Sequence, residues 1–142
     1  LAAHGAKFAS AAPPHIQALA DDGGEESQAR LLEGARLVVI PILKSNMAAS
    51  GISTALNAML LGKCVIASEG PGVSDVFSDE LLTVPPEDAA ALAAMIERAW
   101  NDDALREKTA AAGHRYAMSL GGEPELYQRI IDRLVAWRRG RL

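Results

Sequence analysis

Three short runs of apolar residues divide the chain. They are residues 37–42, 64–68 and 81–85, and each begins directly after a charged residue. A continuous apolar run of about four to eight residues is typical of a strand that is buried on both faces of a parallel sheet. The pattern therefore predicts three buried strands.

Helices are predicted between and after these runs, because apolar residues recur there at the spacing of one helix face. In residues 51–61 they occupy i, i+3, i+4, i+7 and i+8, counted from Ile52. Asp88 is a suitable N-cap for a later helix. The expected core face of that helix is Leu92, Met95, Ile96, Ala99 and Trp100. Further helices are predicted at about 27–34, 72–77, 102–118 and 123–138, the last with Leu126, Ile130, Leu134 and Trp137 on one side.

The alternation of strands and helices predicts an α/β fold, with a Rossmann-like parallel sheet flanked by helices. A length of 142 residues is enough for one core, so we interpret residues 1–142 as a single domain. Residues 1–26 are small and turn-rich and form a poorly defined lead-in, whereas residues 123–142 hold the C-terminal helix. Because the chain opens on Leu1 rather than Met, we expect a piece of a longer protein.

Composition excludes several classes of function. Apolar residues make up 49% of the chain and charged residues 23%, which is typical of a globular protein. The net charge of −4 argues against nucleic-acid binding, and no apolar run approaches the roughly 20 residues of a membrane span. The single cysteine, Cys64, fits a reducing compartment and a cytoplasmic protein. The three histidines share no ligand spacing with one another or with Cys64, so we expect no metal site.

The start of the helix at residues 51–61 is the first candidate for a binding site. Ligands of open α/β sheets bind beyond the carboxyl ends of the strands, and this helix follows the strand at residues 37–42. Its first backbone amides lack helical partners and can hold a phosphate, and Gly51 allows a close backbone approach. Ser50, Thr54 and Asn57 form one stripe on an otherwise apolar helix, where we expect them to be buried and to need partners.

Two interpretations of this polar stripe are open. A bound ligand would supply hydrogen-bond partners to all three side chains. Alternatively, Ser50 caps the helix, Thr54 bonds its own backbone and Asn57 reaches a neighbouring loop. Spacing alone favours neither.

Residues 50–96 resemble a family of known enzymes. Their sequence, SGISTALNAMLLGKCVIASEGPGVSDVFSDELLTVPPEDAAALAAMI, is similar to the donor-binding C-terminal half of GT-B glycosyltransferases, especially the large retaining family 4. Members typically show E-G-F-G-x-x-x-x-E-A-M-A-x-G-K-P-V-I-A-S, then a glycine-rich turn and a strand ending V-P-P. The likeness extends over about residues 37–116. The matching residues are Ala58, Met59, Gly62, Lys63, Val65, Ile66, Ala67, Ser68, Gly72, Val73, Val84, Pro85, Pro86 and Asp88.

The resemblance implies roles for individual residues. In that family, amides at the helix start hold the donor's diphosphate, and two glutamates of an E-x7-E pair lie beside the donor sugar and the ribose. Those positions correspond to Ala49 and Asn57, so both carboxylates are absent, although an amide can still hydrogen-bond ribose hydroxyls. The helix start also resembles the S-G-A-L-T-x-x-E pattern of the peptidoglycan GlcNAc transferase. We expect the nucleotide sugar to be bound by Lys44, Ser50, Gly51, Ile52, Ser53, Thr54, Asn57 and Glu69, and we assign no catalytic residue. Lys44 and Glu69 are included because each follows a strand end; the alternatives are a solvated lysine and a tight turn before the next helix.

The expected function is transfer of a sugar from a nucleotide-diphosphate sugar to an acceptor, without a further cofactor. The acceptor-binding N-terminal half of a GT-B fold is absent from this chain, so residues 1–142 alone are expected to be inactive. One alternative is a UDP-sugar 2-epimerase, whose helix start would read closer to S-G-G-x-Q-E-E. The other is a non-catalytic scaffold, which the absence of the Glu pair favours.

Arginines near the end of the chain are candidates for a contact surface. Arg133, Arg138, Arg139 and Arg141 could meet the N-terminal half or allow peripheral contact with an anionic membrane. We prefer the simpler interpretation that they complement the dipole at the C-terminal end of the last helix. Trp100 and Trp137 lie on predicted apolar faces, and we expect them in the core or in a domain interface.

Overall fold

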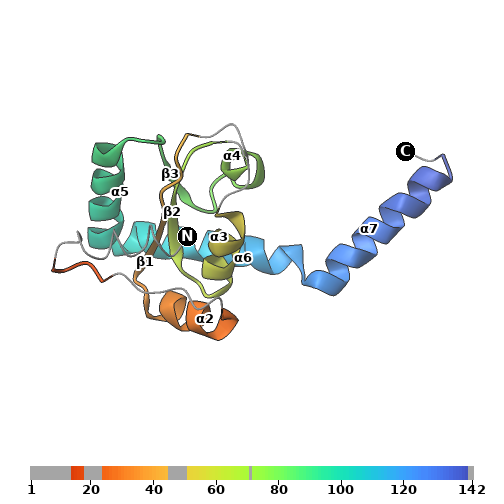
Figure 1. The fold of residues 1–142 in the computed structure, drawn as a ribbon, viewed down its shortest axis with the longest axis horizontal. Helices are drawn as coiled ribbons and strands as arrows, with labels where there is room; N and C mark the ends of the chain where they lie inside the picture. Colours follow the sequence, from red (N-terminus) through yellow and green to blue (C-terminus); the bar gives the residue numbers. More distant parts are fainter. Residues whose placement is uncertain (1–13, 18–23, 45–50, 71, 141–142) are drawn as a thin grey trace, which may run out of the picture. The chain divides into compact units, whose positions relative to one another are not determined.

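The computed structural model of this protein describes residues 14–17, 24–44, 51–70 and 72–140. The chain divides into two compact units, Leu1–Leu31 and Leu32–Leu142, and the second holds the whole sheet. The interpretation of the chain as a single domain stays a prediction. The described elements are α2 (Glu25–Gly34), β1 (Leu37–Ile40), α3 (Ile52–Leu60), β2 (Cys64–Ser68), α4 (Val73–Val76), β3 (Leu82–Val84), α5 (Ala89–Asn101), α6 (Asp103–Leu120) and α7 (Glu123–Arg138) (Figure 1).

The three predicted strands form one parallel sheet in the order β1–β2–β3. Ile40 lies opposite Ala67 in the first pair, and Ile66 lies opposite Leu82 in the second. β2 is in the middle, and all five of its residues are buried. Strands of this kind read as continuous apolar runs because both faces of the sheet are covered. The predicted α/β class with a parallel sheet is confirmed.

Successive side chains of β2 enter two different apolar layers. Val65 and Ala67 belong to the layer that holds α3 and α6. Ile66 points to the opposite face, where it packs with Val84 and with Ala99 of α5. This alternation follows from the two-residue period of a strand. Helices therefore cover both faces of the sheet, as the Rossmann-like pattern predicts (Figure 1).

α6 approaches α3 closely at Gly113. A Cβ atom at this position would lie 2.8 Å from Cγ of Met59 and 2.9 Å from the backbone oxygen of Glu80. The next residue, His114, places its Nδ1 atom 3.2 Å from the backbone oxygen of Met59. α6 therefore fixes the C-terminal part of α3 against the sheet.

Aspartates are the N-caps of α5 and α6, the first two helices after the sheet. Oδ1 of Asp88 accepts a hydrogen bond from the backbone N–H of Ala91 over 2.9 Å, which confirms the predicted N-cap. Asp102 binds the N–H of Leu105 in the same way. Each carboxylate satisfies an amide that has no partner inside its helix.

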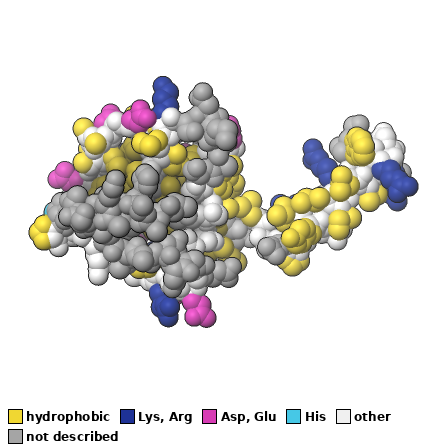
Figure 2. Space-filling view, in the orientation of Figure 1, with side chains coloured by type: hydrophobic (Ala, Val, Ile, Leu, Met, Phe, Trp, Pro, Cys, Tyr) yellow, Lys and Arg dark blue, Asp and Glu magenta, His cyan; other side chains and the backbone are white. Residues whose placement is uncertain are grey.

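Two tryptophans do not enter the core, which corrects the expectation for Trp100. It is 51% exposed, and the guanidinium of Arg36 lies over its ring, 5.0 Å from the ring centre. Trp137 of α7 is 72% exposed, and Figure 2 shows other hydrophobic side chains along the same helix. The expected domain interface over these side chains stays a prediction.

In the part of the chain that is described, no helix combines the length and apolar character needed to cross a membrane.

Candidate functional site

The carboxyl ends of the strands are held together by hydrogen bonds across the sheet. β1 ends before Pro41, which has no N–H to donate to β2. The N–H of Ile42 donates instead to Oγ of Ser68, the last residue of β2, over 3.1 Å. The N–H of Glu69 donates to the backbone oxygen of Val84, the last residue of β3, over 2.8 Å. The segments that follow the three strands therefore leave the sheet along one edge.

The start of α3 lies directly against the end of β1. Gly51, the N-cap, has a φ of 84°, and its carbonyl accepts a hydrogen bond from the N–H of Ala55 over 2.9 Å. A Cβ atom on Gly51 would lie 2.5 Å from Cγ2 of Ile40 and 3.5 Å from Cδ1 of Ile42. Only glycine combines a left-handed backbone with so close an approach. Both features require glycine for the fold itself, and the predicted close approach of a ligand to Gly51 stays a prediction.

The predicted binding residues surround this helix start, as far as they are described. Ile52 and Thr54 are half-buried and Ser53 is exposed. The amides of this first turn have no acceptor four residues before them, and the positive end of the helix dipole lies here. Ser50 and Ala49 lie outside the described residues.

Asn57 is exposed, and the expectation that the polar stripe is buried is wrong for this residue. The inner side of α3 is fully buried at Ala58 and Met59, but Leu60 is 45% exposed and Leu61 is 37% exposed. The helix is apolar on most sides, yet the described residues cover only one of them. Asn57 is therefore not an amide of the core, and its role toward a ribose stays a prediction.

Lys44 and Glu69 bring charge to the same edge of the sheet. Lys44 follows β1, Glu69 follows β2, and both side chains are exposed. The ion pairs of the described residues join Arg36 and Arg106 to Asp103, and neither Lys44 nor Glu69 takes part in them. Both charges are thus accessible beyond the strand ends, where a ligand of an α/β sheet binds.

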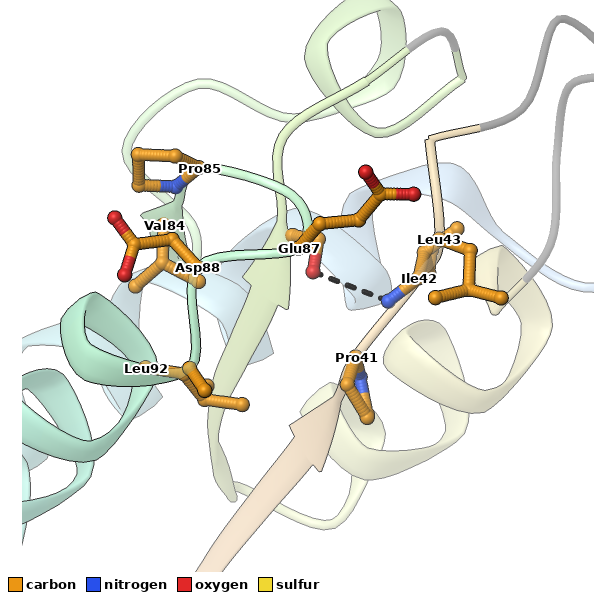
Figure 3. A pocket seen from close by; sticks show the side chains of 10 residues that line it. Pro41, Ile42, Leu43, Val84, Pro85, Glu87, Asp88 and Leu92 are labelled. Carbon is orange, nitrogen blue, oxygen red and sulfur yellow. Dashed lines mark hydrogen bonds between the residues drawn. The ribbon is translucent and has the colours of Figure 1, made fainter.

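A cavity of about 200 Å³, which was not predicted from the sequence, opens at this edge on the side of α5. Its walls include Pro41, Leu43, Ser68, Glu87 and Leu92. Figure 3 shows the residues after β1 on one side of it and the loop between β3 and α5 on the other. Among the residues that the structure describes, none of those expected to bind a nucleotide sugar lines the cavity. The one signal in the sequence is the hydroxyl that ends the otherwise apolar run of β2.

Two further kinds of site find no support. Burial raises the pKa of the Cys64 thiol, and the nearby charge of Arg106 offsets this only in part. A buried thiol that stays protonated is a poor nucleophile. Within the described ranges, no group of three or more His, Cys, Asp or Glu side chains is arranged to hold a metal ion.

Comparison with known families shows which family this chain belongs to. The family described as glycosyl transferases group 1 matches residues 19–116, more than half of the chain. This chain belongs to that family. The predicted resemblance to GT-B glycosyltransferases is therefore confirmed. No curated protein matches the chain.

Solved structures similar to this group 1 chain share its fold. Sucrose-phosphate synthase from Thermosynechococcus elongatus is 28% identical with a TM-score of 0.61, over 78% of this chain and 28% of its own. The C-terminal domain of the group 1 protein LpcC from Francisella tularensis is 25% identical with a TM-score of 0.56, over 73% of this chain and 51% of its own. HepE from Anabaena, solved in complex with UDP, is 19% identical with a TM-score of 0.61, over 75% of this chain and 29% of its own. At this identity the likeness shows only that the two proteins share a fold. The chain thus spans between 28% and 51% of the length of these proteins.

Proposed function

We propose that this group 1 chain binds a nucleotide-diphosphate sugar and contributes the donor site to a glycosyltransferase. The observation that carries the proposal is the start of α3, where Gly51 lies in a left-handed conformation against the end of β1. A Cβ atom at this position would lie against Ile40, so glycine allows the first turn of α3, with its unpaired amides, to lie directly on the end of β1. This is the arrangement in which helix-start amides bind phosphate.

The diphosphate would lie on the first turn of α3. The amides of Ile52, Ser53 and Thr54 supply N–H donors at the positive end of the dipole. Lys44, exposed beyond β1, supplies a positive charge that compensates the diphosphate. Glu69, beyond β2, is on the same edge and can accept hydrogen bonds from sugar hydroxyls.

Asn57 would lie toward the ribose. It follows Gly51 by six residues on the exposed side of α3, so a ligand on the first turn can reach it. A neutral amide contributes about 0.5–1.5 kcal/mol for each hydrogen bond, and a carboxylate about 1.5–3 kcal/mol. Asn57 thus keeps part of the binding energy that a glutamate supplies.

The comparisons support the donor role and leave the acceptor open. HepE was solved with UDP, which makes UDP a suitable first probe. Because the chain spans only part of each similar protein, the acceptor site and transfer itself belong to the proposal. We also propose a cytoplasmic enzyme, because its cysteine is a buried free thiol.

Calorimetric titration with UDP tests this function. Thr54→Val, which keeps the shape of the side chain, and Asn57→Leu should each weaken UDP binding about two- to tenfold, the value of one neutral hydrogen bond. Asn57→Glu should tighten binding several-fold. Asn101→Leu replaces an exposed amide at the end of α5 and serves as the matched control, with unchanged affinity expected.

Each other outcome has its own meaning. Wild-type protein that binds neither UDP nor another nucleoside diphosphate would contradict the donor role and favour a non-catalytic scaffold. Release of an isomerised sugar from a bound UDP-sugar would favour the epimerase. If Asn57→Leu lowers the melting temperature without a separate effect on affinity, the residue is structural.

A further inference from the structure

Ser68 holds a buried hydroxyl at the base of the proposed site. Its side chain is only 4% exposed, and it ends a strand whose other residues are apolar or a thiol. Its Oγ atom accepts the hydrogen bond from the N–H of Ile42, drawn as the dashed line in Figure 3. Because Pro41 cannot donate to the sheet, this side-chain bond takes over where the backbone ladder between β1 and β2 stops.

The bond connects Ser68 to the start of α3 through Ile42. The side chain of Ile42 packs against the apolar layer that includes α3. Its Cδ1 atom lies 3.5 Å from where a Cβ of Gly51 would be, and Cγ2 of Ile40 lies closer still, at 2.5 Å. These two isoleucines form the surface on which Gly51 lies, so the direction in which the chain leaves β1 determines where α3 begins.

We propose that Ser68 is a positioning residue, whose hydrogen bond to Ile42 sets the exit of the chain from β1 and so the position of the first amides of α3. Ser68 does not touch the diphosphate in this account. The proposal deepens the proposed function and rests on it, because the bound diphosphate is what the positioned amides would hold.

The cavity beside Ser68 allows the hydroxyl to be removed without unfolding the domain, so that its effect on the position of α3 can be measured separately. Ser68 and Ile42 both line the cavity of about 200 Å³ beside α5. Water can enter a space of this size and satisfy the Ile42 N–H when the hydroxyl is removed. Loss of the hydroxyl is therefore expected to leave the domain folded while the exit of the chain from β1 becomes variable.

The test compares Ser68→Ala and Ser68→Thr with wild type, using UDP and inorganic pyrophosphate as probes. Ser68→Ala should bind both probes about fivefold or more weakly, since a helix start that is no longer fixed binds less well. Ser68→Thr keeps the hydroxyl and should restore most of the affinity. Thr109→Val is the control, because it removes the hydroxyl of a second buried polar residue, on α6, and should leave both affinities unchanged.

Hydrogen exchange provides a readout that needs no ligand. The amide of Ala55 donates to the carbonyl of Gly51 and closes the first turn of α3. Its exchange should be about tenfold faster in Ser68→Ala, whereas the amide of Leu92 in the first turn of α5 should be unaffected.

Two results would overturn the positioning role. One is an Ala55 amide that exchanges at the wild-type rate in Ser68→Ala. The other is a loss of affinity in both Ser68→Ala and Thr109→Val that is proportional, in each variant, to its loss of thermal stability. If wild type itself binds neither probe, the donor role fails, and the exchange of Ala55 still decides whether Ser68 positions α3.

Discussion

Charged side chains at the two ends of the sheet differ in whether they form ion pairs with one another. At the amino end, Arg36 precedes β1, lies over the ring of Trp100 and forms an ion pair of 3.1 Å with Asp103. Arg106 binds the same carboxylate and donates to the backbone oxygen of Ala99 over 3.2 Å. These charged groups pair with one another at the surface of the domain.

At the carboxyl end, charged groups face solvent and the backbone is strained. Lys44, Glu69 and Glu87 are exposed. Glu87 has a φ of 62°, the single positive value among non-glycine residues of the described ranges. Strained backbone gathers where the rest of the fold holds it in place, often at ligand sites. The comparison indicates that one end of the sheet stabilises the fold and the other is available for binding.

The largest expected effect comes from adding a methyl group at either end of α3. Gly51→Ala should lower the free energy of unfolding by about 2–4 kcal/mol, because it combines a left-handed backbone with overlap against Ile40. Gly62, which follows the helix, has a φ of 66° and nothing within 4 Å of a Cβ. Gly62→Ala should therefore cost only about 1–2 kcal/mol, the backbone term alone. Urea unfolding of both variants measures the difference.

Equal losses in the two variants would contradict the close approach of α3 to β1. UDP titration of Gly51→Ala under conditions where it is folded extends the comparison. Its affinity should fall, whereas that of Gly62→Ala should not, because only Gly51 borders the proposed phosphate site.

A smaller effect is expected where α6 packs on α3. Gly113→Ala should destabilise the domain by about 1–2 kcal/mol, since overlap with Met59 and with the backbone oxygen of Glu80 exceeds the gain in helix propensity. Gly34→Ala, at the end of α2, meets nothing within 4 Å and should be neutral or stabilising. Thermal unfolding would reveal the opposite signs, and UDP affinity of folded Gly113→Ala should equal that of wild type. A matching shift in both variants would show that the contact between α3 and α6 is loose.

The smallest effect concerns pH at the amino end. The hydrogen bond from Arg106, more than the charge of Arg36, lowers the pKa of Asp103 from its usual value of 3.8. The unfolded chain therefore takes up this proton first, so the stabilisation is complete above about pH 4 and is lost as pH falls through the lower folded pKa. Asp103→Asn should lose less stability between about pH 5 and pH 2 than wild type. Because Asp103 is exposed, high salt should shrink the difference, and identical acid profiles in low salt would argue against the ion pairs.

Sequence patterns predicted an element well where this chain itself buries both of the element's faces. β2 was predicted with its observed bounds, because a short, continuous apolar run between two helices is typical of a strand buried on both faces of a parallel sheet. Asp88 was found as an N-cap because its chemistry is local. α2 begins two residues earlier than predicted, and β1 ends two residues earlier, because Pro41 stops the ladder.

Long-range contacts are what the sequence did not reveal. An apolar pattern cannot tell which sides of α3 are covered, so the exposure of Asn57 had to come from the structure. Neither the cation–π contact between Arg36 and Trp100 nor the bond between Ser68 and Ile42 follows from spacing, because each joins residues far apart in the chain. The described residues that were expected to bind the nucleotide sugar lie on α3 or in the segments that follow β1 and β2, and their roles stay predictions.

The central claim is that the start of α3 is where this glycosyl transferases group 1 chain holds a nucleoside diphosphate. Two-dimensional ¹H–¹⁵N spectra recorded during a UDP titration test it most directly, because each amide reports its own surroundings. The account predicts that the largest shifts belong to Gly51, Ile52, Ser53 and Thr54, with the amides around Asp103 unchanged. Shifts concentrated at the cavity beside Leu92, or saturating UDP that moves no amide of the first turn of α3, would contradict it.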